Sequence, residues 1–238
     1  DFTLSRSRGF IIAGAIYYSG FQSGDIIVRA EPLEGYGDVT IQTSLHKVDN
    51  YSMNNAVPAQ TYQVMGFRDS DGNAFCDYWE AQGVWSGNPL GPLLADASGI
   101  NIVLADPCSP SGIPYWWWRQ YFGNMARTQF DEQDTDLSLA DTDRDGLNNF
   151  GEFMAGTDPL NDQSVLALKD IYRTVDGTIW LEWTSTVGRL YSVWRSSSAG
   201  TAYDLMNPAV TSTPPFNLYP DYSATGFGPY FYRVQVGP

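Results

Sequence analysis

Acidic and amide side chains alternate through one twelve-residue segment in the middle of the chain, from Asp141 to Glu152. They occupy positions 1, 3, 5, 9 and 12 of the segment, and Gly146 occupies position 6. Ca²⁺ is a hard cation that takes about six to eight oxygen ligands, so a short loop must offer alternating side chains, a carbonyl and a closing bidentate carboxylate. Four carboxylates this close repel one another unless a cation neutralises them. The spacing therefore predicts a calcium-binding loop rather than a solvated acidic turn.

Each position of this loop has an expected role, in the ligand order of EF-hand-type calcium loops. Gly146 is expected to take the turn that a β-carbon hinders. The closing carboxylate stands at position 12, and the residue at position 7 offers its backbone carbonyl. The predicted ligands are Asp141, Asp143, Asp145, Leu147, Asn149 and Glu152.

A second segment, Asp69 to Glu80, repeats this pattern less closely, because its glycine, Gly72, stands at position 4 rather than 6. The alternative for this segment is an ordinary acidic hairpin tip. Two such loops in one chain nevertheless support each other. With the carbonyl of the seventh residue included, the predicted ligands are Asp69, Asp71, Asn73, Phe75, Asp77 and Glu80.

The composition favours a mostly β protein and disfavours several kinds of partner. Of the 238 residues 15% are aromatic, with 23 glycines and 14 prolines, and long helical periodicities are scarce, which is typical of short strands between turns. The net charge of −14 leaves no basic stripe to bind nucleic acid, and it disfavours an anionic membrane surface equally. No segment approaches the length of a membrane span. A calcium-rich extracellular setting fits this balance.

The fold class expected is mostly β, with two β-sandwich domains joined by a short helical calcium-binding connector. Residues 1–106 form the first domain, with the calcium loop 69–80. Residues 107–164 form the connector, with the calcium loop 141–152. Residues 165–238 return to β structure.

The connector is expected to contain a helix that opens at Pro114 and ends at Gly123, and a short helical turn after its calcium loop. Segment 125–140 is polar and acidic, with no element assigned, and 212–220 is a proline-rich connection. The strands expected are Gly9–Ser19, Asp25–Ala30, Asp38–Leu45, Thr61–Arg68, Ile100–Ala105, Val165–Tyr172, Thr178–Trp183, Arg189–Arg195 and Pro229–Val236.

The two cysteines, Cys76 and Cys108, are expected to form a disulfide. The bridge would close a loop of about 33 residues and contribute about 3–4 kcal/mol in the chain-entropy model. The calcium loops independently suggest an oxidising compartment. The alternative is two free, buried thiols.

Enzymatic machinery is not expected in this chain. The single histidine, His46, is interpreted as a surface strand residue, and any triad of the serine-hydrolase kind would have to use it. Nucleotide-binding and zinc-protease motifs are missing from the sequence. A carboxylate pair for glycoside hydrolysis is not ruled out by counting, but the clustered acids are already interpreted as calcium ligands.

The tryptophans have three alternative interpretations: core and interdomain packing, a subunit interface, or a carbohydrate-binding face. Consecutive residues on a helix are about 100° apart, so Trp116, Trp117 and Trp118 cannot all enter one core. At least one of them is expected to meet a neighbour or solvent. The tryptophans are Trp79, Trp85, Trp116, Trp117, Trp118, Trp180, Trp183 and Trp194.

The segment from Asp141 to Leu160 resembles the thrombospondin type 3 and dockerin-like calcium repeats of bacterial secreted proteins, through Asp-x-Asp-x-Asp-Gly-Leu-Asn-Asn and Ala-Gly-Thr-Asp-Pro. The resemblance implies a further metal-site role for Asp158. The segment 112–123 looks like a sibling repeat in which Ser111, Tyr115 and Trp118 replace the acidic ligands. It is therefore interpreted as a degenerate repeat without calcium.

Two looser resemblances concern the ends of the chain. Residues 15–20, 61–73 and 98–104 resemble a prealbumin-like, carboxypeptidase-regulatory-like sandwich. Residues 187–196 and 228–234 are similar to a fibronectin type III-like module. None of these resemblances implies catalysis.

The sequence therefore predicts a secreted, calcium-stabilised structural or adhesive protein of the cell surface or extracellular matrix, with Ca²⁺ as its only cofactor. Self-association into a filament is expected from the surplus of aromatic residues and from the strand-like segment Asp1–Arg8, which could pair with the sheet edge of a neighbouring copy. The alternative is a carbohydrate-binding accessory module of a secreted enzyme. A passive spacer fits the same sequence.

Overall fold

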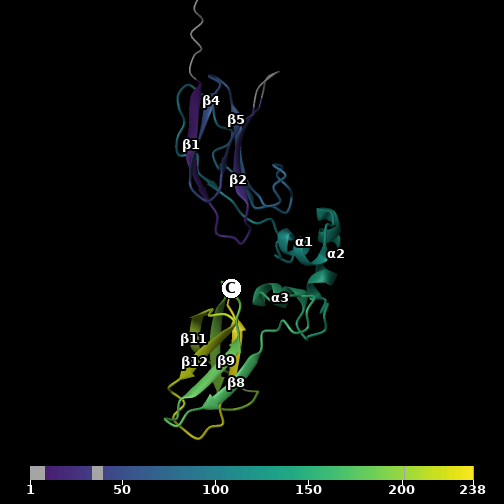
Figure 1. The fold of residues 1–238 in the computed structure, drawn as a ribbon, viewed down its shortest axis with the longest axis vertical. Helices are drawn as coiled ribbons and strands as arrows, with labels where there is room; N and C mark the ends of the chain where they lie inside the picture. Colours follow the sequence, from purple (N-terminus) through teal and green to yellow (C-terminus); the bar gives the residue numbers. More distant parts are fainter. Residues whose placement is uncertain (1–8, 34–39, 201, 238) are drawn as a thin grey trace, which may run out of the picture. The chain divides into compact units, whose positions relative to one another are not determined.

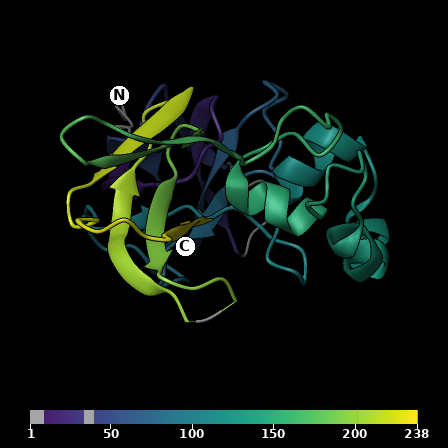
Figure 2. The same ribbon diagram turned by 90° about the horizontal axis from the view of Figure 1, so that it is seen from below.

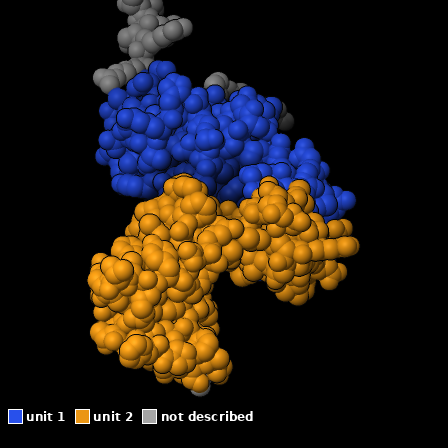
Figure 3. All heavy atoms as spheres, turned by 60° about the horizontal axis from the view of Figure 1, so that its bottom comes forward, with its two compact units in different colours: residues 1–132 blue, residues 133–238 orange. Residues whose placement is uncertain are grey.

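The computed structural model describes residues 9–33, 40–200 and 202–237, and the described chain is mostly β (Figure 1). Four small sheets are formed, and three helices lie between residues 115 and 155. The chain divides into two compact units, Asp1–Glu132 (unit 1) and Gln133–Pro238 (unit 2) (Figure 3). The division at residues 106 and 164 stays a prediction, and the pairing segment Asp1–Arg8 lies outside the described residues.

Unit 1 contains two sheets, of order β3-β2-β5-β6 and β4-β1-β7. The pairings are antiparallel except between β1 and β7, which run parallel. The strands are β1 (Phe10–Tyr17), β2 (Asp25–Pro32), β3 (Ile41–Leu45), β4 (Asn50–Ala56), β5 (Tyr62–Asp69), β6 (Gln82–Val84) and β7 (Ile102–Val103).

Alternate residues of these strands build the core of unit 1. Ile26, Val28 and Ala30 of β2 are fully buried and share a cluster with Ile12 and Ile16 of β1, which belong to the other sheet. Period-two burial follows from the alternation of side chains along a strand. Because β5 runs from this core to Asp69, the first acidic loop starts at the end of a core strand.

The aromatic helix α1 (Tyr115–Phe122) has the predicted bounds, between Pro114 and Gly123. Trp117 and Trp118 are buried, whereas Trp116 is half-buried. The three tryptophans thus do not enter one core equally, as their helical spacing predicts.

Helix α2 (Arg127–Leu139) occupies a segment to which the sequence analysis assigned no element. It is polar on nearly every face, so no apolar stripe signals it. Phe130, at 1% exposure, anchors it in unit 1 against Tyr115 and Trp118. Among the described residues, no helix has the length and apolar character needed to cross a membrane.

Unit 2 contains the short helix α3 and two antiparallel three-stranded sheets, of order β12-β9-β8 and β11-β10-β13. Figures 1 and 2 show α3 beside the strands rather than among them. The elements are α3 (Asn149–Ala155), β8 (Leu168–Arg173), β9 (Ile179–Thr184), β10 (Leu190–Ser196), β11 (Asp204–Thr211), β12 (Phe216–Asp221) and β13 (Phe231–Val236).

Strand β12 corrects the interpretation of residues 212–220 as a connection. It pairs with β9 along its whole length, including Pro220 opposite Trp180. Proline is tolerated here because β12 lies at the edge of its sheet, where one side of the strand needs no ladder hydrogen bonds.

Asp221, at the end of β12, connects the two sheets of unit 2. Its buried carboxylate accepts hydrogen bonds from Arg195 of β10 at 2.7 Å and from the hydroxyl of Tyr232 of β13 at 2.8 Å. The backbone and hydroxyl of Ser223 donate to it as well. Burial alone would raise the pKa of Asp221, but the hydrogen bonds from Ser223, Tyr232 and Arg195 outweigh it and hold the pKa below its ordinary value.

We predict that the stability of unit 2 depends on the charge of Asp221. A depressed folded-state pKa contributes stability that is present above the unfolded value, about 3.9, and is lost as the pH falls through the folded value. Asp221→Asn should lower the free energy of unfolding by about 2–3 kcal/mol at neutral pH, and this difference should shrink below pH 4. Urea titrations at several pH values measure it, with Asp170→Asn as a control on exposed β8; equal loss in both variants would contradict the prediction.

Candidate metal centres

The loop 141–152 brings the carboxylates of Asp141, Asp143 and Asp145 together, with one ligand atom of each within 4.8 Å of the others. One oxygen of Asp143, one of Asp145 and both of Asp141 accept backbone N–H groups of the loop itself, at 2.7–3.1 Å. These bonds hold the three side chains in place, and the second oxygens of Asp143 and Asp145 accept no hydrogen bond. The structure therefore confirms an acidic group here that could hold a metal ion.

Three buried carboxylate oxygens of this loop have no hydrogen-bond partner: Oδ2 of Asp143, Oδ2 of Asp145 and Oε2 of Glu152. Glu152 is completely buried, and its other oxygen accepts a long bond of 3.5 Å from the Thr157 hydroxyl. Burial, followed by the charges of Asp143 and Asp145, raises the pKa of Glu152 to about 7. Buried charges without partners are costly, so this donor set fits a cation.

Helix α3 positions Glu152 in its first turn. Asn148 caps the helix, and its side chain accepts the N–H of Gly151 at 2.8 Å. At the other end Gly156 has a φ of 75°, a left-handed conformation that glycine adopts without strain, and its N–H bonds to the carbonyl of Glu152. The local sequence Asn-Asn-Phe-Gly-Glu therefore folds as a capped helix that delivers the closing carboxylate to the loop.

Asn149, the predicted ligand at position 9, is fully buried and fixes the loop to the end of α2. Its amide donates to the carbonyl of Leu137 at 2.7 Å, and its oxygen accepts the Thr142 hydroxyl at 2.9 Å. Its ligand role, and that of the Leu147 carbonyl, stay predictions. Asp158 lies in a turn, where it accepts the N–H of Leu160 at 3.0 Å, and its metal role also stays a prediction.

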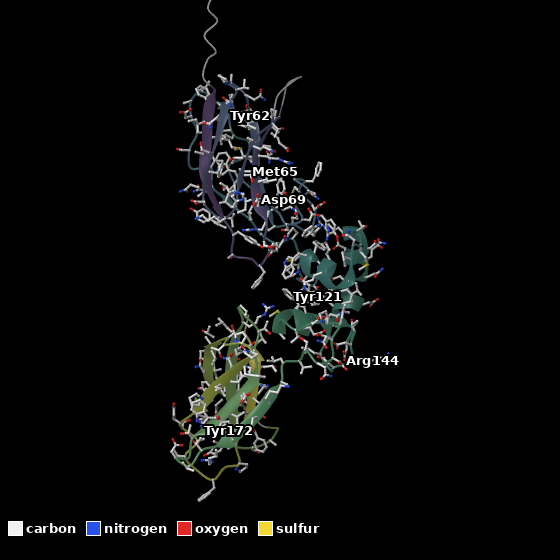
Figure 4. The ribbon with its side chains drawn as sticks, viewed as in Figure 1. Tyr62, Met65, Asp69, Tyr121, Arg144 and Tyr172 are labelled. Atoms are coloured by element: carbon white, nitrogen blue, oxygen red, sulfur yellow. The ribbon has the colours of Figure 1, made fainter. Side chains whose placement is uncertain are left out.

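The loop 69–80 forms a second acidic group, from Asp69, Asp71 and Glu80. Figure 4 shows Asp69 at the end of β5. Asp69 is buried, and its Oδ1 has no partner. Glu80 is fully buried as well, and its two oxygens accept the N–H groups of Ser70 and Asp77, at 2.6 and 3.1 Å. Burial raises the pKa of Glu80 despite these two bonds.

The remaining predicted ligands of this loop form hydrogen bonds with one another. The Asn73 amide donates to Asp77 at 2.8 Å, and its oxygen accepts the N–H of Phe75 at 2.6 Å. The Phe75 side chain is exposed, which leaves it no packing role in the described structure. Ligand roles for these three residues stay predictions.

The two loops share one backbone feature that the sequence pattern conceals. Positions 4 and 6 have positive φ in both: Gly72 and Ala74 at 76° and 63°, and Arg144 and Gly146 at 70° and 100°. Each loop therefore places its glycine at one of two left-handed positions and a strained residue at the other. Figure 4 marks Arg144 on the loop between α2 and α3.

The predicted disulfide is wrong, because Cys76 and Cys108 are both free. Cys76 is half-buried in the loop 69–80, and burial, followed by the charge of Glu80, raises the pKa of its thiol to about 11. Cys108 is exposed, and its thiol lies 3.3 Å from the carbonyl oxygen of Asp106. Sequence spacing gives the length of the closed loop but not the short Cα separation that a bridge requires.

Residues that sequence reasoning missed support both loops. Arg119 of α1 lies 3.7 Å from Asp71, and Arg189 donates to the carbonyl of Phe153 in α3 at 2.6 Å. Neither arginine stands near a loop in sequence, so no local signal could have indicated these contacts. The Thr157 bond to Glu152 stands within the Gly-Thr-Asp motif, where a closer reading of the sequence could have found it.

A scan against known protein families finds no match to this chain, and a search of curated proteins finds no significant relative.

We predict that Gly146→Ala destabilises unit 2. The position of the added β-carbon is open, with no heavy atom within 4 Å, so the cost comes from the backbone alone and amounts to about 1 kcal/mol. Urea unfolding in calcium buffer measures it. Ala74→Gly is the matched comparison. Its free energy of unfolding should change little, because relief of the left-handed strain at Ala74 offsets the greater conformational entropy of the unfolded chain. A Gly146→Ala protein as stable as its parent would refute the role of the positive φ.

Proposed function

We propose that this chain is a calcium-stabilised structural protein of an extracellular environment, built from two β-sandwich domains with a calcium-binding helical connector. The observation that carries the proposal is the set of unpartnered, buried oxygens of Asp143, Asp145 and Glu152. Oxygen donors alone are the ligand chemistry of Ca²⁺ and Mg²⁺, and a crowded set of side-chain carboxylates favours the larger ion.

When bound, calcium supplies positive charge to carboxylates that otherwise repel one another. A ligand that binds only the folded state stabilises that state by mass action. Extracellular calcium modules have dissociation constants of about 10⁻⁴–10⁻³ M, so about 1 mM calcium contributes about 0.4–1.4 kcal/mol per site. Sites of this affinity would fill at the millimolar calcium of the proposed extracellular setting.

Contacts within unit 2 connect the second loop to the sheets. Arg189, at the start of β10, donates to the carbonyl of Phe153 and places its guanidinium over that ring, 5.9 Å from the centroid. Next to it, Gly156 packs so closely that an added β-carbon would lie 2.8 Å from Thr186. A loop made rigid by calcium would therefore hold α3 against the strands, which supports a bracing role.

The surroundings of the chain's histidine support scaffolding rather than catalysis. The His46 side chain is 92% exposed, just after β3, and pairs with Asp25 at 2.8 Å. A general base needs a substrate pocket and water exclusion around it, and a fully solvated imidazole provides neither. Among the described residues, the buried acids Asp69, Glu80 and Glu152 belong to the two loops and Asp221 to its own network, while Asp134 lies on α2.

The outer face of the sheet β12-β9-β8 favours self-association, with glycan binding as the second candidate. Tyr172 of β8 pairs with Trp180, and Leu218 of β12 lies one step along the same face. Tyr172 and Leu218 are 40% and 52% exposed. Exposed apolar patches mark contact surfaces. The same aromatic pair stands beside the carboxylates of Asp170 and Glu182, an arrangement that would also suit stacking on sugar rings.

Calcium should raise the melting temperature of the protein by about 2–8 °C relative to EDTA. Glu152→Gln removes the closing charge of the second loop, so this variant should lose one bound ion in isothermal titration calorimetry and part of the thermal shift. Glu132→Gln, an exposed substitution on α2, is the matched control. If Glu152→Gln binds as many ions as the parent protein, the assignment of this site fails.

Trp180→Ala should weaken self-association through the outer sheet face by at least tenfold, because aromatic anchors dominate such contacts. Sedimentation of the full chain in calcium measures it, and Trp194→Ala, on a strand of the other sheet, is the comparison. A glycan array run in parallel tests the second candidate. A parent protein that is monomeric at high concentration and binds glycans through Trp180 would replace self-association by carbohydrate binding.

A further inference from the structure

Helix α1 places a permanent positive charge at the loop 69–80. The Arg119 guanidinium lies 3.7 Å from Oδ2 of Asp71 and stacks over Trp79, 4.2 Å from the ring centroid. The side chains of Arg119 and Asp71 are each 30% exposed. The loop therefore has a counter-charge before any metal ion binds.

Further contacts within unit 1 hold this helix to the same loop. The hydroxyl of Tyr78 donates to the carbonyl of Met125 at 2.6 Å, and its ring meets Tyr115 edge-on at 5.5 Å. Tyr78 and Trp79 are the two residues before Glu80, which closes the loop. Arg119 therefore belongs to a helix that is itself packed against the loop 69–80, so the fold holds its guanidinium beside Asp71.

The loop 141–152 has no equivalent ion pair among the described residues, although it contains Arg144. Across the described residues, no ion pair involves Asp141, Asp143 or Asp145, and three buried carboxylate oxygens of that loop are without partners. In the loop 69–80 the corresponding atom is Oδ1 of Asp69. The two loops have positive φ at the same two positions, but only in the loop 69–80 does a described arginine pair with a carboxylate.

We propose that Arg119 is a built-in counter-cation of the loop 69–80 that competes with Ca²⁺ for Asp71. The inference rests on the proposed calcium binding and refines it. The loop 69–80 keeps its fold without metal and binds calcium more weakly than the loop 141–152. The loop 141–152 depends on the ion. The two sites therefore fill in order as the calcium concentration rises.

The competition follows from the chemistry of the two cations. Arginine pairs with one planar carboxylate, whereas calcium gathers several oxygens at once. To use Asp71, the ion must break a partly buried ion pair that contributes about 1 kcal/mol, and the displaced guanidinium repels the ion. Together these effects weaken calcium binding by about five- to tenfold. After calcium displaces Arg119 from Asp71, the guanidinium would keep its cation–π contact with Trp79.

Calorimetric calcium titration of the full chain tests the inference, in a background with Asp145→Asn to weaken the other site. Arg119→Gln should tighten binding at the loop 69–80 about fivefold and lower the melting temperature in EDTA. Arg127→Gln is the matched control, because Arg127 likewise lies over an aromatic ring, that of Tyr115 in α1, and pairs with an aspartate, Asp131. The control excludes a general effect of one lost positive charge.

A second variant keeps the test decisive if Arg119→Gln folds poorly. Arg119→Lys retains the charge, so it should bind calcium within about twofold of the parent affinity. Affinity unchanged or weakened in Arg119→Gln, or tightened equally in Arg119→Lys or Arg127→Gln, would overturn the inference. So would a loop 69–80 that binds no calcium with or without Arg119. In that case, calcium binding by the loop 141–152 in the parent chain would still leave the proposed function standing.

Discussion

Mutual repulsion among buried carboxylates is the constraint on which both loops depend. Glu152 is completely buried beside Asp143 and Asp145, and Asp69 and Glu80 are buried in the other loop. Charges in such places destabilise a fold unless partners satisfy them. Backbone N–H groups of each loop take some of the oxygens, but they cannot neutralise the charge. A cation could do so, and among the described residues an ion pair supplies one at the loop 69–80, where Arg119 approaches Asp71.

This local constraint reaches the rest of the fold because each loop joins two regular elements. The loop 69–80 continues the core strand β5 and is followed by β6, so its closure fixes how these neighbouring strands meet. The loop 141–152 lies between α2 and α3, and Arg189 ties α3 to the start of β10. The same kind of loop thus closes a hairpin in one unit and a pair of helices in the other. A bound ion would act on strand pairing in unit 1 and on helix docking in unit 2.

The sequence predicts features that depend on neighbouring residues and fails on those that depend on distant ones. The acidic groups were found because their members stand within one twelve-residue segment each, and most strands because their apolar residues alternate. Helix α2 was missed because Phe130 is its only buried apolar residue, and the other buried positions are the polar Asp134 and Ser138. Strand β12 was missed because Pro220 is compatible with an edge strand but does not indicate one. The disulfide was wrongly expected because the spacing of two cysteines says nothing of their separation in space.

Under the proposed calcium binding, departure from the motif would be a poor guide to the relative strength of the two sites. The loop 69–80 matches the calcium pattern less well because its glycine has moved from position 6 to position 4. Both positions are left-handed in both loops, so this exchange leaves the backbone nearly unchanged. The larger difference lies outside the motif, in Arg119, which comes from α1 and approaches Asp71. If both loops bind calcium as proposed, the charge delivered by the surrounding fold would influence affinity alongside the order of ligands along the chain.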